Sequence, residues 1–271
     1  MAKLSGEFKD ARNKPKRVDE IFDEQIEMAM HEHKRSNRDL FMSGVSAGLE
    51  IGFTVFLMAT VYTKFHGIVN PSVMDILLAI SYPLGFVFVI IGRSQLFTEH
   101  TTLAVLPVLN RDATIKSLLV LWALIYTGNL LGGYFFGFIM AIIPERLGAV
   151  EVGSFEALAA SLIDHPWYLI AGSGILAGWL MGLLSWLVTA SQETISRIMI
   201  IGLITTVIGI GGLHHCIVGS IEIFTAALTS KSIGILEYLK VQTWATLGNI
   251  IGGVVFVAFA KFSHVRYNEK H

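Results

Sequence analysis

Charged residues and cysteine are scarce in this chain of 271 residues. Asp, Glu, Lys and Arg make up only 15% of the residues, whereas a soluble domain usually has about 25%, and 53% of the residues are hydrophobic. The single cysteine, Cys216, excludes an intramolecular disulfide and a metal cluster held by cysteines. Because the sequence also lacks metal-ligand spacings, nucleotide motifs and nucleophile–base sets, we expect no enzyme, no metal, no cofactor and no nucleic-acid partner.

Long apolar segments dominate what remains. Six of them are long enough to cross a membrane, whose hydrocarbon core takes about 20 helical residues. They lie near residues 39–63, 72–108, 115–143, 167–190, 194–229 and 237–262. The second and fifth are too long for one straight span, which predicts a broken helix in each. The first ten residues contain no apolar run, so no cleavable signal peptide is expected. The sequence predicts an all-α integral membrane protein with six transmembrane helices.

Three patterns of the first half of the chain recur in the second half. The run GRSQLFT at 92–98 resembles GSIEIFT at 219–225, and GNLLGG at 128–133 resembles GNIIGG at 248–253. A third pattern, glycine at every fourth residue, starts at Gly44 and again at Gly174. Such ladders let helix backbones approach closely, and their recurrence indicates a duplicated membrane unit.

The duplicated units are predicted to have opposite orientations. Each holds three spans, an odd number, so the second copy enters the membrane from the other side. We expect repeat one at about 39–143 and repeat two at about 167–262, with breaks at 92–98 and 211–220 that mark one interior region. A break inside a bilayer must be shielded by protein or face a water cavity, which predicts a transport pathway.

Basic residues gather on one predicted side of the membrane. That side holds 15 of the 20 Lys and Arg, against four on the other side, so both termini are expected in the cytoplasm, at the inner (plasma) membrane. We expect residues 1–36 to form an N-terminal tail, with an amphipathic helix at 18–35. Residues 37–264 would form a single transmembrane channel domain, and 265–271 a C-terminal tail.

The residues at the two predicted breaks, taken together with the Gly-Asn helices, match the pattern of a known family. Leu96-Phe97-Thr98 in the first break, His215 in the second and the two Gly-Asn…Gly-Gly helices resemble the formate/nitrite transporter family, over roughly residues 20–265. Within that family the chain looks most like the YfdC-like branch. The resemblance implies a homopentamer in the lipid bilayer with an aquaporin-like pore in each protomer. It also implies passage of small monovalent anions or their neutral acids, such as formate, nitrite or hydrosulfide.

The resemblance further assigns roles to hydrophobic residues. Leu96 and Phe97 would form a constriction on the first break, with Phe86 facing them. Tyr82 and Ile208 would line the other constriction.

Between the constrictions the resemblance places a hydrogen bond from Thr98 to His215. An anion could gain a proton there, because the unperturbed pKa of histidine, about 6.5, lies near working pH. A structural core histidine is the alternative. From the residues themselves, Asn129 and Asn249 are expected to hydrogen-bond the exposed backbone of the breaks.

The chain departs from the family pattern by its charges. Arg93-Ser94-Gln95 stands where the family usually has Gly-Ala-Asp or Gly-Ala-Glu, and Glu50, Glu99 and Glu222 also lie at membrane depth. Charges at such depth normally pair or face water. If GRSQLFT and GSIEIFT correspond, Arg93 and Glu222 approach each other, which predicts an ion pair, with Glu99 as the rival partner. This pair would act as a selectivity element or as a structural clamp.

Three functions therefore stay open. The first is a channel for a small monovalent anion or its neutral acid. The second is a cation- or proton-selective channel on the same scaffold, favoured by Glu50, Glu99 and Glu222. The third is a plugged, non-transporting membrane scaffold.

Overall fold

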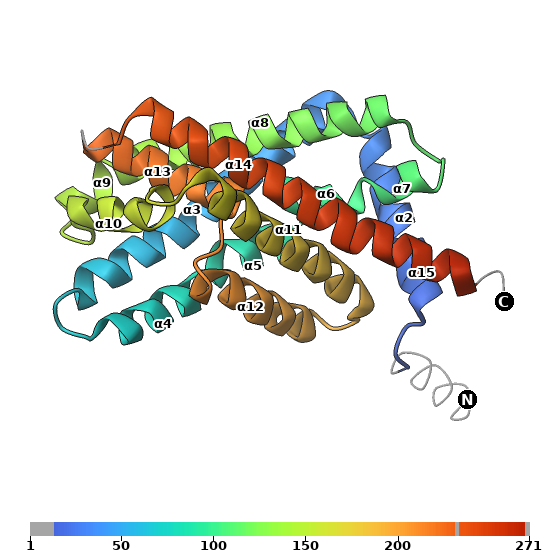
Figure 1. Ribbon diagram of the computed structural model, residues 1–271, viewed down its shortest axis with the longest axis horizontal. Coiled ribbons are helices and arrows are strands. Elements are labelled where there is room, and N and C mark those ends of the chain that lie inside the picture. The colour runs from blue at the N-terminus through green and yellow to red at the C-terminus, as the bar shows by residue number, and fades with distance from the viewer. Residues whose placement is uncertain (1–13, 231–232, 269–271) are drawn as a thin grey trace, which may run out of the picture.

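The structure, a computed structural model, describes residues 14–230 and 233–268, apart from the side chains of Arg266 and Asn268 (Figure 1). The predicted tails extend beyond these limits, so residues 1–13 and 269–271 lie outside the described residues. The described part is built from helices and has no β-strand. Its α-helices are α2 (Val18–Lys34), α3 (Asn37–Phe65), α4 (Pro71–Ser81), α5 (Pro83–Gly92), α6 (Phe97–Leu103), α7 (Leu106–Leu109), α8 (Ile115–Met140), α9 (Ile143–Arg146), α10 (Val152–Ile163), α11 (Trp167–Ala190), α12 (Thr194–Ile210), α13 (Cys216–Thr229), α14 (Ile235–Gly253) and α15 (Ala260–Asn268).

Five stretches of the described chain are long and apolar enough to cross a membrane. They are Asn37–Phe65, Pro71–Gly92, Ile115–Arg146, Trp167–Ala190 and Ile235–Val265. The remaining predicted span, 194–229, is divided as expected into α12 of 17 residues and α13 of 14 residues. Each of these two helices is too short to count as a membrane-spanning helix by itself, so the structure bears out five of the six predicted spans by length and composition, and the sixth stays a prediction.

Other interruptions escaped the sequence prediction. Tyr82 separates α4 from α5, where Pro83 cannot donate a backbone hydrogen bond. The Thr54 hydroxyl repairs this point, since it donates to the Tyr82 carbonyl at 3.0 Å and accepts from the Gly85 N–H at 2.9 Å. A second irregularity is a π-helix at Val254–Phe259, between α14 and α15.

Both predicted breaks are present. In the first, α5 ends at Gly92 and α6 begins at Phe97; in the second, α12 ends at Ile210 and α13 begins at Cys216. Between these helices the chain is not helical. Figure 1 shows α2 and α15 at one end of the molecule, and α9 and α10 at the opposite end.

Two glycine-lined helix pairs frame the breaks: α3 packs on α8, and α11 packs on α14. A Cβ atom at Gly48 would collide with the carbonyl of Asn129, and one at Gly178 would collide with the carbonyl of Asn249. The predicted close approach of backbones at the ladders is therefore confirmed, and it brings each asparagine next to a break.

Gly178→Ala should destabilise the protein, because the added methyl group meets immovable backbone. We expect a cost of about 1–3 kcal/mol, typical of overpacking. Gly172→Ala on the same helix is the control, since its Cβ would have nothing within 4 Å. Thermal unfolding in detergent measures both variants; equal melting temperatures for the two would contradict the packing described here.

Candidate functional site

Asn129 of α8 holds the first break. Its Oδ1 accepts the Phe97 N–H at 2.8 Å, and its Nδ2 donates to the carbonyls of Gly44 at 2.8 Å and Gln95 at 2.9 Å. The Gln95 N–H donates to the Ser43 hydroxyl at 3.2 Å. The asparagine is fully buried, so its bonds to Phe97 and Gln95 replace helical partners that the unwound backbone has lost, and its bond to Gly44 ties the break to α3.

Asn249 of α14 makes the same set of bonds at the second break. Its Oδ1 accepts the Cys216 N–H at 2.9 Å, and its Nδ2 donates to the carbonyls of Gly174 at 2.8 Å and His214 at 2.9 Å. The His214 N–H donates to the Ser173 hydroxyl at 2.9 Å. The predicted task of both asparagines, hydrogen bonding to the exposed backbone of the breaks, is confirmed by these contacts.

The recurrent bonds relate the two breaks residue by residue. Gln95 corresponds to His214 and Phe97 to Cys216, an offset of 119 in each case (214 − 95 and 216 − 97). The same offset relates the residue with positive φ in each break, Arg93 at 61° and Gly212 at 57°. The left-handed turn that starts each break is thus the same, although only one of the two residues is a glycine.

This correspondence overturns the register predicted from the motifs. Aligning GRSQLFT at 92–98 with GSIEIFT at 219–225 implies an offset of 127, eight residues too many. The first motif spans its break, whereas the second lies inside α13. The likeness of the two runs therefore does not mark equivalent positions.

The predicted ion pair between Arg93 and Glu222 is consequently wrong. Arg93 is exposed at the first break, and Glu222 is buried at the seventh position of α13, with 4% exposure. No ion pair joins them, and Arg93 does not pair with Glu99 either, among the residues that the structure describes.

Thr98 and His215 connect the two breaks. Their Oγ1 and Nε2 atoms lie 2.8 Å apart, as predicted, and both residues are almost completely buried. The other ring nitrogen, Nδ1, accepts the Val218 N–H at 3.3 Å and so caps α13. A neutral ring with this acceptor at Nδ1 carries its proton on Nε2 and donates it to Thr98, which frees the threonine hydroxyl to donate elsewhere.

The hydrophobic residues predicted for the constrictions surround this bond. All are at most 5% exposed: Tyr82, Phe86, Leu96, Phe97 and Ile208. Phe86 stands edge-on to the His215 ring at 5.2 Å between centroids and stacks on Tyr82 at 5.5 Å. Phe97 instead packs on Trp122 and Tyr126 of α8. The assignment of these side chains to two constrictions stays a prediction.

Glu50 of α3 belongs to the support of the first break. Its Oε1 accepts the hydroxyls of Ser46 and Ser94, each at 2.9 Å, and its Oε2 is buried without a hydrogen-bond partner among the described residues. The carboxyl group therefore holds Ser94 in place beside Arg93.

A cavity of about 780 Å³ ends at the first break, and we call it the α2 cavity. Gln95, Glu99 and His100 line it, whereas Leu96 is fully buried beyond it. The His100 Nε2 is bonded to the Gln95 Oε1, and the Trp122 indole donates to the His100 carbonyl at 2.9 Å.

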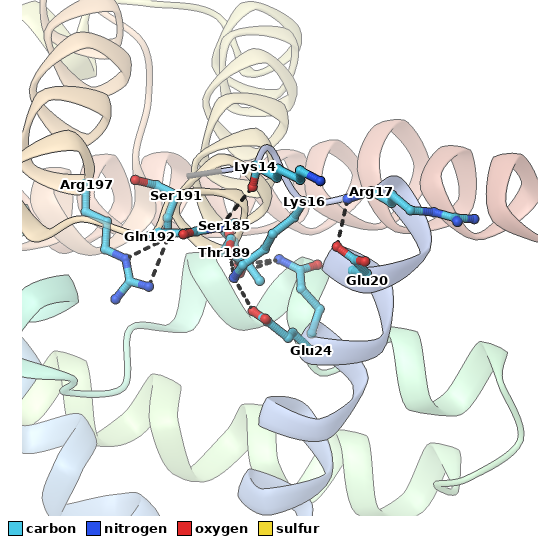
Figure 2. Close-up of polar contacts among 11 residues, drawn as sticks. Lys14, Lys16, Arg17, Glu20, Glu24, Ser185, Thr189, Ser191, Gln192 and Arg197 are labelled. Atoms are coloured by element: carbon cyan, nitrogen blue, oxygen red, sulfur yellow. Dashed lines mark hydrogen bonds and ion pairs between the residues drawn. The ribbon is translucent and has the colours of Figure 1, made fainter. Parts of the chain in front are cut away.

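Helix α2 forms one wall of this cavity and is attached to the end of α11 (Figure 2). Lys16 donates to the Thr189 carbonyl at 2.8 Å and pairs with Glu24 at 2.6 Å. Buried Gln25 lies 3.3 Å from the hydroxyls of Ser185 and Thr189. The helix at 18–35 was predicted, but its role as a cavity wall was missed, because contacts of this range have no local sequence signal.

Removal of the Asn129 or Asn249 side chain should lower the stability of the protein more than removal of an ordinary polar side chain. Asn249→Leu removes the partner of the Cys216 N–H and of the His214 carbonyl in a buried site, and each such group costs about 1–3 kcal/mol when it is left unpaired. Asn70→Ala, which removes only an exposed helix cap, is the control.

Size-exclusion chromatography and thermal unfolding in detergent measure the outcome. We expect the Asn249 and Asn129 variants to lose folded protein to similar extents. A wild-type melting temperature for Asn249→Leu would contradict the stabilising role of the Asn249 hydrogen bonds at the second break.

The geometry agrees with three comparisons with known proteins. The family model for formate/nitrite transporters matches residues 19–263, and the chain belongs to this family. It is 28% identical to the inner membrane protein YfdC of Escherichia coli strain K12, over 88% of this chain and 79% of that protein. It is 26% identical to the formate channel FocA of Haemophilus influenzae, over 80% of this chain and 83% of FocA.

Solved structures share the fold. An FNT family ion channel superposes with a TM-score of 0.79 at 20% identity, covering 90% of this chain and 98% of that one. A pentameric formate channel with formate bound gives 0.74 at 23% identity, covering 86% and 98%.

Proposed function

We propose that this chain forms a channel for small monovalent anions or their neutral acids, of the formate, nitrite and hydrosulfide class, in the inner (plasma) membrane. The observation that carries the proposal is the joining of two asparagine-clamped helix breaks by the Thr98–His215 hydrogen bond. Unwound backbone at membrane depth is tolerated where it is buried in protein or lines a water-filled cavity, and broken helices are typical of transport sites. Membership in the formate/nitrite transporter family supports the same class of solute.

The proposed architecture is a homopentamer with one aquaporin-like pore in each protomer. Two inverted repeats, at about 39–143 and 167–262, would contribute three crossings each within a domain at 37–264. The constant offset of 119 between the breaks supports the duplication. The likeness to a pentameric formate channel supports the assembly.

Cytoplasmic termini are part of the proposal. The positions of α2 and α15 at one end of the molecule support an even number of crossings (Figure 1). The excess of Lys and Arg in the segments next to these helices supports the cytoplasm as their side.

In the proposed channel, the Thr98 hydroxyl would donate a hydrogen bond to the solute. With the His215 proton directed at Thr98, the threonine hydroxyl is free to donate to an anion or to its neutral acid. The surrounding apolar residues strip water from the passage, and an unpaired charge is costly there, so the neutral acid crosses more readily than the anion.

Two alternatives lose their structural basis. A plug formed by Arg93 and Glu222 lacks its ion pair in the described chain. Glu50 is absent from the lining of the α2 cavity and accepts two serine hydroxyls instead, which removes one of the three carboxyl groups that favoured a cation pathway.

Reconstituted protein should carry formate, nitrite and hydrosulfide into proteoliposomes, faster as the pH falls from 8 to 5. Light scattering after a gradient of each salt measures the flux, and empty vesicles give the background. Reversal potentials in planar bilayers provide the second readout. A cation-selective current, or no flux above that of empty vesicles, would refute the proposal.

Thr98→Val should lower formate flux at least about 10-fold, because the variant keeps the shape of the side chain but loses a hydrogen bond worth about 1.5 kcal/mol or more to a charged or partly charged solute. Thr205→Val is the matched control, since the Thr205 hydroxyl only bonds the carbonyl of Ile201 in its own helix. Equal flux through both variants would remove Thr98 from the pathway.

A further inference from the structure

Two side chains of opposite charge line the α2 cavity without partners. Arg93 is exposed and Glu99 is half-buried, and neither side chain forms a hydrogen bond or an ion pair with a described residue. Both lie at the first break, Arg93 at its start and Glu99 as the third residue of α6, which follows the break.

The other charged groups of the cavity wall are mostly engaged. From α2, Glu24 pairs with Lys16, and Glu32 pairs with both Arg35 and His31, whereas Glu27 is exposed. From α12, Arg197 donates to the Ser191 carbonyl at 3.0 and 3.2 Å. From α6, His100 is bonded to Gln95. Apart from the exposed Glu27, Arg93 and Glu99 are thus the charged residues of the lining that have no partner in the described part of the chain.

The backbone gives no reason for an arginine at position 93. Its φ of 61° lies in the left-handed region, which is unfavourable for residues other than glycine, and the second break has Gly212 at the equivalent place with φ 57°. Backbone strain of this kind favours a functional reading of the side chain. Here the side chain adds a cation to the lining of the α2 cavity.

His215 is poorly placed as the source of a proton for an incoming anion. Both of its ring nitrogens are engaged, Nε2 with Thr98 and Nδ1 with the Val218 N–H. Protonation of Nδ1 would break the cap of α13. The Glu99 carboxyl group has no hydrogen-bond partner among the described residues. It lines the cavity and directly follows Thr98 in the chain.

We infer that Arg93 and Glu99 form an anion-loading site for the conjugate base of a weak acid. The inference rests on the proposed function. The guanidinium binds the anion, and the carboxylic acid of Glu99 transfers its proton to it. The O–H bond of Glu99 breaks as the O–H or S–H bond of the solute forms, with no change in oxidation state. The neutral acid then passes the buried apolar residues beyond Gln95, and the Glu99 carboxylate recovers a proton from water in the cavity.

The site also defines which solutes are carried. A planar guanidinium binds small planar anions such as formate and nitrite through paired hydrogen bonds. Nitrate is also a small planar anion that offers a pair of oxygens, but it is the base of a strong acid, so Glu99 cannot protonate it. Nitrate should therefore occupy the site and inhibit formate uptake without being carried.

Formate-driven acidification inside proteoliposomes, reported by an enclosed pH dye, tests the inference on the full-length chain. Glu99→Gln should reduce formate flux about 10-fold or more at pH 7, where free formic acid is scarce, and much less at pH 5, where the solvent supplies the acid. Glu99→Asp should restore part of the flux at pH 7. Glu27→Gln removes an exposed carboxyl from the same cavity and should behave as the wild type.

The role of Arg93 is tested by a second quantity, the formate concentration that half-saturates the flux. Arg93→Gln and Arg93→Gly should each raise the half-saturating formate concentration about 3- to 10-fold, and Arg93→Lys less. Arg93→Gly removes both the unfavourable backbone conformation and the positive charge, whereas Arg93→Gln removes the charge alone. An equal rise of the half-saturating formate concentration in the two variants would therefore assign the loss of affinity to the guanidinium. Inhibition by nitrate should weaken in the same two variants.

The outcomes separate the two claims. Wild-type flux through Glu99→Gln at both pH values, in protein that elutes as the wild-type assembly, overturns the loading site and leaves the channel proposal standing. Formate flux of the wild type no greater than that of empty vesicles overturns the channel proposal and, with it, the loading site.

Discussion

The asparagine amide at each helix break is the interaction on which this structure depends. A helix can stop inside a membrane only if its freed N–H and C=O groups find partners, and at each break one amide side chain bonds one freed N–H and one freed C=O, with a third bond to the carbonyl of a neighbouring helix. The glycines at 48 and 178 serve this arrangement, because only a residue without Cβ lets the asparagine-bearing helix approach so closely. The glycine ladders, the asparagines and the breaks are therefore one structural device, present twice.

The order of the device sets the position of the central polar pair. Asn129 fixes the N–H of Phe97, and Thr98 is the next residue of α6. Asn249 fixes the N–H of Cys216, and His215 is the residue before it, at the end of the second break. The hydrogen bond between Thr98 and His215 thus follows from clamps on two different helices. In the proposed channel, the two asparagines would thus hold in place the polar groups that bind the solute, and few such groups would be needed.

Much of this could be predicted from the sequence, and the failures have physical causes. Apolar length, glycine spacing and the Gly-Asn motifs are local properties, so they correctly indicated the membrane helices, the breaks and the task of Asn129 and Asn249. The register between the breaks was wrong because the two Phe-Thr runs look alike but occupy different places, one at a break and the other inside α13. The same error produced the predicted Arg93–Glu222 pair. The α2 cavity arises from contacts between residues more than 100 positions apart, such as Lys16 with Thr189, and periodicity carries no information about those.

A map of the full-length protein in lipid nanodiscs with formate, by electron cryomicroscopy at a resolution that shows water, tests the account most directly. The account predicts solute or water density inside each protomer, within hydrogen-bond distance of the Thr98 hydroxyl, with both asparagine amides bonded to the unwound backbone. Solute density on the central axis of the assembly, or breaks that face lipid on separate sides of the protomer, would contradict it.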